Sequence, residues 1–308
     1  MKYPITVIIT TLDREDITLA TLRSFEKQTS LDFELIVLDQ TTPASSRLAA
    51  YKSPGYHYHY HHHCKKNLPN ARNIAAQIAQ GEILLFVDDD VIPGTDLVAQ
   101  FLREFDQNDD SIWVIGGRIY ESNSNILCEN QNIAGGYLTW YGKTLKNLSA
   151  KKYAVCQWVG GGNFAVRREK FSAVGGFDAN FIGNAILEDG DFGFRIRASG
   201  GHVLFSPLPT LEHLRATSGG TRGFDRDFSM YYRSHNTVYF FRKHKRIVYL
   251  PVVFLYLNAV WLNDLIHKRH SYKAYFFMLM GFVKGFFTKV PAPRSLPLLA
   301  KERSPVLT

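Results

Sequence analysis

Cysteine is scarce in this sequence, and its spacing argues against one class of protein. The chain has 308 residues but only three cysteines, Cys64, Cys128 and Cys156. They lie far apart with no metal-like spacing, so we expect no disulfide framework, and a reducing compartment fits the sequence. The first residues, Met1–Pro4, precede no long apolar stretch, so we also expect no secretory signal.

Acidic residues are scarce as well, but only in the C-terminal part. Residues 241–308 contain 12 Lys or Arg and only Asp264 and Glu302 as acids, whereas residues 1–240 contain 24 basic and 26 acidic residues. The basic excess therefore lies in the tail. Because the tail is also aromatic and apolar, it predicts contact with a membrane surface and argues against nucleic acid as a partner.

Long clean apolar runs are missing too. Residues 247–262 are uncharged, and residues 275–290 are interrupted by Lys284 and Lys289. Neither run reaches the about 20 apolar residues that a spanning helix needs. We therefore expect a basic, apolar, helical region over residues 226–308 that lies on, or dips into, the inner leaflet. A re-entrant or spanning hairpin, and a homodimer interface made of the same surface, are the alternatives.

What is present, up to residue 95, is a regular alternation of strands and helices. The pattern predicts strands at Ile5–Thr10, Phe33–Leu38, Tyr56–Tyr60 and Gly81–Val87, with helices at Asp16–Gln28 and between Asn67 and Gly81. This order is typical of an α/β fold with a mixed, mostly parallel central sheet. Later residues are less regular, with strands expected at Ile112–Ile119, Trp158–Arg167 and His202–Phe205, a helix at Glu188–Ala198, and a long connection over 121–153.

The triplet Asp88-Asp89-Asp90 directly follows the apolar strand 81–87. Three adjacent like charges repel one another, and a divalent cation such as Mg²⁺ or Mn²⁺ neutralises them well because hard metals prefer oxygen ligands. Alternation along an extended chain places Asp88 and Asp90 on one face and Asp89 on the other. The simpler interpretation is a solvated acidic turn after a strand.

Polar residues also follow the other predicted strands. Thr10-Thr11 and Asp39 stand, like the acidic triplet, at predicted carboxyl ends. Ligands bind at this edge of open α/β sheets. The convergence therefore predicts a ligand site there.

These segments together resemble the family-2 glycosyltransferases, which are inverting enzymes of the GT-A fold. The matching segments keep the family's order and spacing over residues 3–215: Val7–Arg14, Glu34–Asp39, Asn70–Asn73, Asp88–Asp90, Gly161–Arg167, Gly175–Asp178 and Glu188–Asp191. The resemblance implies a GT-A domain over residues 1–225. Its residues 1–95 would bind a nucleotide sugar and its residues 96–225 the acceptor.

The resemblance also implies roles on the donor side. Thr11 and Asp39 would contact the base and ribose, and Arg72 would lie near the base or diphosphate, where a permanent cation is useful. Asp90 would ligate Mg²⁺ or Mn²⁺, with Asp88 contacting the ribose or the metal. The donor-binding set implied in this way is Thr11, Asp39, Arg72, Asp88 and Asp89. A turn former at Asp39 and a surface charge at Arg72 are the simpler interpretations.

On the acceptor side, Glu188 and Asp189 resemble the family's acidic pair. A displacement at the anomeric carbon needs a base for the acceptor hydroxyl, and a shielded carboxylate suits that task. We expect Asp189 to be the base and Glu188 to position the acceptor, with Asp191 as the second choice for the base. The alternative is that all three cap the following helix, since acids are favoured in a first turn.

Three further features are open to two interpretations. His213 either completes the metal site or is structural. Residues 215–222 form either a lid over phosphates or an ordinary loop. The histidine-rich run 56–64 fits an edge strand better than a zinc site, because closed zinc sites use two separated pairs of ligands. Trp140, Tyr141 and Trp158 would either stack on acceptor sugars or belong to the core.

The sequence as a whole predicts a metal-dependent inverting glycosyltransferase at the cytoplasmic face of a membrane. It would move a sugar from a nucleoside-diphosphate donor to a hydroxyl of a glycan or lipid-linked acceptor. Two alternatives stay open. One is a GT-A-like protein that binds sugar nucleotides or glycans without catalysis, and the other is a nucleotidyltransferase, which would release pyrophosphate.

Overall fold

The computed structural model describes residues 2–121, 128, 130–220 and 225–298. Its centre is a nine-stranded sheet in the order β3-β2-β1-β4-β10-β6-β11-β5, with β9 paired to β11. The strands are β1 (Tyr3–Thr11), β2 (Glu34–Asp39), β3 (His57–His62), β4 (Gly81–Val87), β5 (Val91–Pro93), β6 (Ile112–Tyr120), β9 (Ala154–Cys156), β10 (Asn163–Arg167) and β11 (His202–His213).

The strand directions confirm the predicted α/β class with a mixed, mostly parallel sheet. Strands β1, β2, β3, β4, β6 and β11 run one way, because β10 is antiparallel to both β4 and β6. The short strands β5 and β9 run antiparallel to β11. The carboxyl ends of β1, β2 and β4 therefore lie at one edge, as expected.

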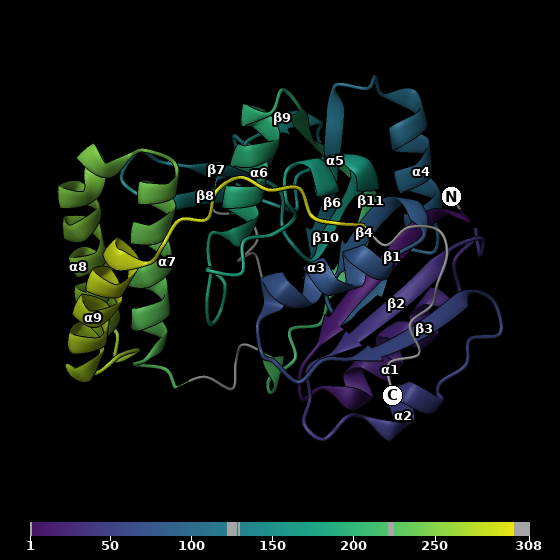
Figure 1. Cartoon of the computed structure of the whole chain (residues 1–308), viewed down its shortest axis with the longest axis horizontal. Coiled ribbons are helices and arrows are strands. Elements are labelled where there is room, and N and C mark those ends of the chain that lie inside the picture. The colour runs from purple at the N-terminus through teal and green to yellow at the C-terminus, as the bar shows by residue number, and fades with distance from the viewer. Residues whose placement is uncertain (1, 122–127, 129, 221–224, 299–308) are drawn as a thin grey trace.

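Helices cover both faces of this sheet (Figure 1). Side chains alternate along β1, with Ile5, Val7 and Ile9 in one apolar cluster and Ile8 in the other. Helices α1 (Glu15–Phe25) and α4 (Leu97–Gln107) pack on the first face, and α3 (Leu68–Ile78), α5 (Arg168–Ala173) and α6 (Glu188–Ala198) on the second. A short helix α2 (Ser46–Ala50) follows β2.

Several elements differ from the expectation. The region 121–153, predicted to be a long connection, contains a hairpin of β7 (Gly135–Leu138) and β8 (Thr144–Asn147). The last long strand continues to His213 instead of ending at Phe205. The histidine-rich run forms β3 at the sheet edge, as predicted, and in the described part of the chain it forms no group with metal-ligand geometry.

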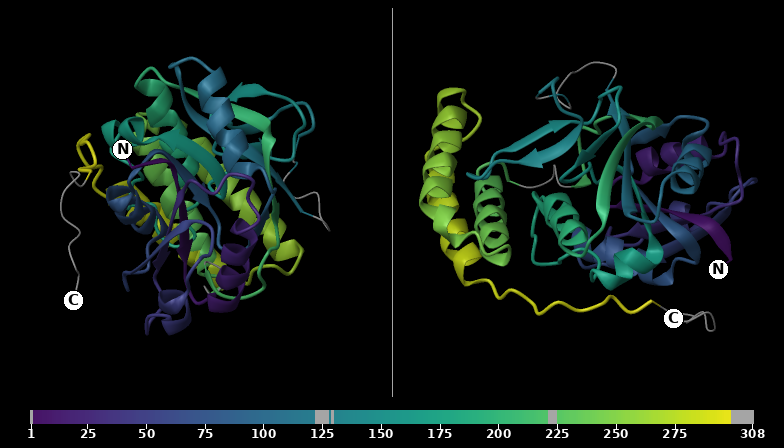
Figure 2. Two further views of the ribbon diagram at one scale, coloured as in Figure 1. Left: turned by 90° about the vertical axis from the view of Figure 1, so that its right-hand side faces the viewer. Right: turned by 90° about the horizontal axis from the view of Figure 1, so that it is seen from above.

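The C-terminal region is helical, as predicted. It consists of α7 (Ser229–Lys243), a short turn η2 (Ile247–Tyr249), α8 (Leu250–Ile266) and α9 (Lys273–Phe287). These helices lie side by side at the end of the molecule remote from β3, with α7 nearest the sheet (Figures 1 and 2). Gly281 and Gly285 allow α9 to touch the backbone of α7, because a Cβ there would lie 2.2 Å and 2.4 Å from the Tyr231 and His235 carbonyl oxygens.

The helical layer is tied to the α/β domain a second time. After α9, the chain runs back across the molecule to α5 (Figure 1), where the Leu296 backbone N–H donates to the Ser172 carbonyl over 2.9 Å. Leu296 also packs against the second apolar cluster of the sheet. The layer is therefore fixed at α7 and at this returning segment.

Among the described residues, one helix is long and apolar enough to cross a membrane. The stretch Ile247–Ile266 has 20 residues and a mean hydropathy of 1.4, and 17% of its apolar window is buried. The sequence alone predicted a stretch too short to span. The difference arises because the helix continues beyond Leu262 to Ile266 and η2 precedes it.

Candidate active site

A cavity of about 610 Å³ opens at the carboxyl ends of β1 and β4. The structure brings most of the expected site residues to its wall: Thr11, Arg72, Asp88, Asp89, Asp90, Glu188, Asp189 and His213. They come from segments up to about 200 residues apart, since the carboxyl edge of the sheet collects the loops that follow its strands.

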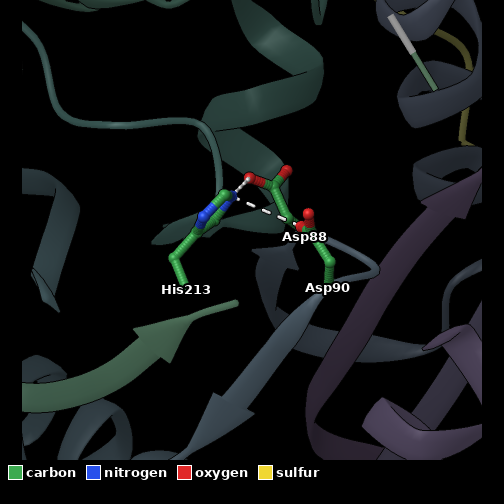
Figure 3. A group of neighbouring side chains, drawn as sticks. All are labelled: Asp88, Asp90 and His213. Atoms are coloured by element: carbon green, nitrogen blue, oxygen red, sulfur yellow. Dashed lines mark ion pairs between the residues drawn. The ribbon is translucent and has the colours of Figure 1, made fainter. Parts of the chain in front are cut away.

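One side of the cavity carries a group suited to a divalent cation. Asp88, Asp90 and His213 each offer a ligand atom, and these atoms lie within 4.8 Å of one another (Figure 3). His213 Nε2 is 3.3 Å from Asp90 Oδ1 and 3.8 Å from Asp88 Oδ2. Two carboxylates and an imidazole are an oxygen-rich donor set that fits Mn²⁺ or Mg²⁺.

The backbone orients Asp90 within this group. Its Oδ2 accepts a hydrogen bond from the Ala216 N–H over 2.8 Å, and its own carbonyl accepts one from the Leu214 N–H. The first bond leaves Oδ1 facing His213. Contacts of this kind, behind a ligand, set the direction in which it coordinates.

Asp89 is held differently, by protein partners. Arg14 Nη1 lies 2.8 Å from Asp89 Oδ1, and the Thr11 hydroxyl donates to Oδ2 over 2.7 Å. Burial nevertheless raises the pKa of Asp89 to about 6, with Arg14 acting in the opposite direction. Thr11 and Asp89, both expected to touch the donor, are thus bound to each other at the cavity wall.

Arg72 joins the metal side of the cavity to the opposite acidic pair. Its guanidinium donates to Glu188 Oε1 over 2.6 Å and lies 3.6 Å from both Asp88 Oδ1 and Asp189 Oδ1. It also donates to the Gly161 carbonyl. The sequence placed Arg72 near a base or diphosphate, and the structure places it between three carboxylates.

The two oxygens of Asp189 have different surroundings. Its Oδ2 accepts from the Gly161 N–H over 3.0 Å, whereas Oδ1 is buried near Arg72 and has no hydrogen-bond partner among the described residues. Burial raises the pKa of Asp189 to about 6 and raises that of Glu188 as well, against the lowering effect of Arg72. A carboxylate that lines a cavity and has a raised pKa is suited to accept a proton.

The local backbone explains how both sides reach one cavity. Leu187, directly before α6, has φ 71, so a left-handed residue turns the chain sharply into the acidic first turn. Gly161 and Gly162 form the floor between the two sides. A Cβ on Gly162 would lie 2.2 Å from Asp88 Oδ2, and one on Gly161 2.6 Å from Asp189 Oδ1.

Two expected residues lie away from the cavity. Asp39 is fully buried, and its carboxylate accepts bonds from the Thr41 and Ser45 N–H groups and from the Tyr60 hydroxyl. Asp191, the second choice for the base, is paired with cations on the far side of α6. Neither is among the residues that line the cavity.

Sequence reasoning assigned no role to several residues that the structure places here. Arg14 and Gly161-Gly162 belong to the matched segments, so their signal was present in the sequence. Tyr232 of α7 also lines the cavity and gave no signal. In the expected lid, 221 and 222 lie outside the described residues, while Ser218 accepts a bond from Arg14. Trp140 is exposed and Trp158 is buried.

The comparisons with known proteins fit this geometry. Residues 6–175, more than half of the chain, match the family model "Glycosyl transferase family 2". The chain belongs to this family. It is thus a glycosyltransferase of an inverting family that uses nucleotide-sugar donors. A comparison with curated proteins gives no match.

Solved structures of low sequence identity share the fold. GalNAc-T7 with UDP, GalNAc and Mn²⁺ has 19% identity and a TM-score of 0.61 over 78% of this chain, which spans 48% of that one. The mannosyltransferase PcManGT from Pyrobaculum calidifontis, with GDP-Man and Mn²⁺, has 16% identity and a TM-score of 0.56, covering 92% of this chain and 86% of that one. S. aureus TarS 1–349 with UDP-GlcNAc has 14% identity and a TM-score of 0.56, covering 78% and 66%.

Proposed function

We propose that this chain is a metal-dependent inverting glycosyltransferase in which Asp189 is the general base. It transfers a sugar from a nucleoside-diphosphate donor to a hydroxyl of a glycan or lipid-linked acceptor. One observation carries the proposal: a single guanidinium, Arg72, contacts the metal-side Asp88 and the acid pair Glu188 and Asp189. The cation site and the base therefore face the same cavity.

On the donor side, we assign the metal to Asp88, Asp90 and His213. When bound, Mn²⁺ or Mg²⁺ would neutralise the charge that develops on the departing diphosphate. GalNAc-T7 and PcManGT have been solved with Mn²⁺, which supports the choice of metal class. Behind this site, Arg14 and Thr11 bind the Asp89 carboxylate, and these contacts fix the middle residue of the Asp88–Asp90 triplet.

The nucleotide would lie along the ends of β1 and β2. Thr11, Asp39, Arg72, Asp88 and Asp89 remain the proposed donor-binding set. Asp39 would act from behind the cavity wall, because the Ser45 and Thr41 N–H groups and the Tyr60 hydroxyl occupy its carboxylate. UDP-GlcNAc and GDP-Man, the donors bound by TarS and PcManGT, define the two donor classes to test first.

On the acceptor side, the Asp189 carboxylate is the group that would take the proton. The Gly161 N–H holds its Oδ2, so the carboxylate cannot rotate freely. Glu188 Oε2 is buried beside the cavity without a hydrogen-bond partner among the described residues, which supports the proposed role of Glu188 in holding the acceptor. Residues 1–95 would then form the donor half and residues 96–225 the acceptor half of the catalytic domain.

The helices of residues 226–308 would attach this domain to a membrane. Two stripes of exposed apolar side chains are here called the outer face. One runs along η2 and α8 and the other along α9: Val248, Leu255, Leu262 and Ile266 on the first, and Phe276, Met280, Val283 and Phe287 on the second. Because the glycine side of α9 is packed on α7, the outer face is left exposed on the surface of the helical layer. We therefore place these helices on the cytoplasmic leaflet, with Lys268, Arg269 and Lys284 near anionic lipid.

A donor panel tests the activity. The full chain is incubated with UDP- and GDP-sugars, with Mn²⁺ or Mg²⁺, and scored by thermal shift and by release of nucleoside diphosphate. We expect one donor to stabilise the protein in the presence of metal and to release nucleoside diphosphate when an acceptor is added. Pyrophosphate release would indicate a nucleotidyltransferase, and binding without any release would indicate a binding protein; either contradicts the proposal.

Vesicle sedimentation tests the membrane proposal. The wild-type chain should sediment with vesicles containing anionic lipid, and the pair Leu255→Glu and Phe276→Glu should stay in the supernatant. Leu208→Glu is the control, because Leu208 is exposed but lies on β11, away from the outer face. If the wild type stays soluble and forms a dimer that the same pair dissociates, the outer face is a homodimer interface.

A further inference from the structure

Helix α7 lies between the catalytic acid pair and the outer face. On one side it packs against α9, where Gly281 and Gly285 touch its backbone. On the other side it faces the chain segment 178–191, which carries part of the cavity wall and the start of α6. Helix α7 therefore contacts both α9 and the segment that carries the acid pair.

Buried charges make the contact between α7 and α6. Asp191 is fully buried, and Lys243 Nζ at the end of α7 lies 2.8 Å from its Oδ1. His244 Nε2 lies 2.9 Å from the same oxygen, and Arg195 Nε 2.9 Å from Oδ2. Removing one partner from such a buried group leaves the others uncompensated, so the group is held firmly.

The same lysine holds a second point of the segment. Lys243 Nζ donates to Asp178 Oδ2 over 2.7 Å, and the Tyr239 hydroxyl donates to the same oxygen over 2.7 Å. Further along α7, the Asn236 side chain donates to the Ile182 carbonyl and accepts from the Ile182 N–H. Ile182 lines the cavity, so α7 fixes both the cavity wall and the helix behind it.

The geometry of the first turn of α6 links these contacts to catalysis. Asp189 and Asp191 are two residues apart, so they point to nearly opposite sides of the helix. Asp191 anchors the far side, while Asp189 lines the cavity. The preceding Ala185 and Leu187 have φ 52 and 71, an unfavourable conformation that packing must maintain.

We propose that Lys243 is a positioning residue for sugar transfer. By joining Asp191 and Asp178, it fixes the rotation of the first turn of α6 and so the direction of the Asp189 carboxylate. Helix α7 also packs against the helices of the outer face. The contacts of Lys243 with Asp178 and Asp191 therefore connect the membrane-binding layer to the general base. The inference rests on the proposed function, because it assigns Lys243 a role in the step that Asp189 performs.

The test compares Lys243→Met with the wild-type chain under donor-saturating conditions. A displaced base lowers kcat by about tenfold to a hundredfold. The KM for donor and the affinity for Mn²⁺ should stay within about twofold, because Lys243 donates to Asp178 and Asp191, which are outside the proposed metal ligands and donor-binding set. Lys243→Arg retains the charge and both hydrogen bonds, so it should recover most of kcat.

The control is Val238→Ala, which removes buried apolar contacts from the same helix without touching a charge. It should lower the melting temperature and leave kcat unchanged. If Lys243→Met does not fold, Lys243→Gln, which retains a donor of similar reach, takes its place. A folded variant with wild-type kcat, or equal losses in kcat for Val238→Ala and Lys243→Met, would overturn the inference. A wild-type chain that transfers no sugar from any donor would instead refute the proposed function.

Discussion

The two acidic groups of the cavity are similar in sequence but held in different ways. The group Asp88–Asp90 follows a strand, and the group Glu188–Asp191 opens a helix. Arg72 contacts Asp88, Glu188 and Asp189, and in each group one further carboxylate is hydrogen-bonded to other cations of the protein. In the first group that residue is Asp89, and in the second it is Asp191.

The number of neighbouring cations decides whether the pKa of Asp89 or Asp191 is raised or lowered. Asp89 has one close arginine, Arg14, and burial still raises its pKa to about 6. Asp191 is buried too, but Arg195, His244 and Lys243 together hold its pKa well below its usual range. A single cation does not offset the desolvation of a buried carboxylate here, whereas three do. Asp191 is therefore a structural anchor and unsuited to be a base.

Removing the metal should have the largest effect on sugar transfer. Among the two acidic groups, it concerns only the first, which contains the proposed ligands Asp88 and Asp90. Chelation, or Asp90→Asn, should lower sugar transfer by about a thousandfold or more, since the metal supplies several kcal/mol of charge stabilisation. The measurement is nucleoside diphosphate release with and without Mn²⁺. Asp191→Asn is the comparison variant and should still bind Mn²⁺. Undiminished transfer in the presence of chelator would show that the first group holds no catalytic cation.

Asp191→Asn should cause the largest loss of stability. It leaves Arg195 and His244 without their counter-charge and Lys243 with Asp178 alone, which costs about 3–5 kcal/mol of unfolding free energy. Asp189→Asn should cost no stability, because burial already disfavours the charge of Asp189. Urea unfolding of both variants measures the contrast, and equal losses would mean that the two residues do not differ as described.

Gly162→Ala tests the first group without changing a charge. The new Cβ would meet Asp88 Oδ2 at 2.2 Å and push the carboxylate away from His213. Disturbing the support of a metal ligand weakens metal binding by about ten- to a hundredfold. Calorimetry with Mn²⁺ gives the value. An unchanged affinity would remove Asp88 from the proposed ligand set.

The pH dependence of kcat should report the ionisation of Asp189 in the second group. It is the smallest of the expected effects. A general base works deprotonated, and the pKa of Asp189 is raised to about 6. With the donor saturating, kcat should therefore fall below about pH 6, by about tenfold per pH unit. In Asp189→Asn this limb should disappear. A wild-type profile that is flat down to pH 5 would argue against Asp189 as the base.

Much of the fold followed from local patterns. Apolar alternation identified β1, β2 and β4, and parallel strands necessarily bring their carboxyl ends to one edge. The same alternation separated Asp88 and Asp90 from Asp89, and the structure brings Asp88 and Asp90 together with His213. The hairpin β7–β8 was missed because its strands are short and lack an apolar period.

The partners of the acidic residues could not be predicted in this way. Arg14 lies 75 residues from Asp89 in the sequence, and Lys243 lies 52 from Asp191. Only tertiary packing brings these pairs together, so no local pattern showed which carboxylate would be anchored. For the same reason, Asp191 was a reasonable candidate for the base until its cations were seen.

The most direct test of the account is sugar transfer by Asp189→Asn, measured beside Asp191→Asn. The exchange retains the shape of Asp189 and its bond from the Gly161 N–H, so donor and Mn²⁺ should bind as they do in the wild type. We expect kcat to fall by about a hundredfold to ten-thousandfold, as loss of a general base predicts. Transfer at the full wild-type rate by a folded, donor-bound Asp189→Asn would contradict the central claim that this carboxylate takes the acceptor's proton.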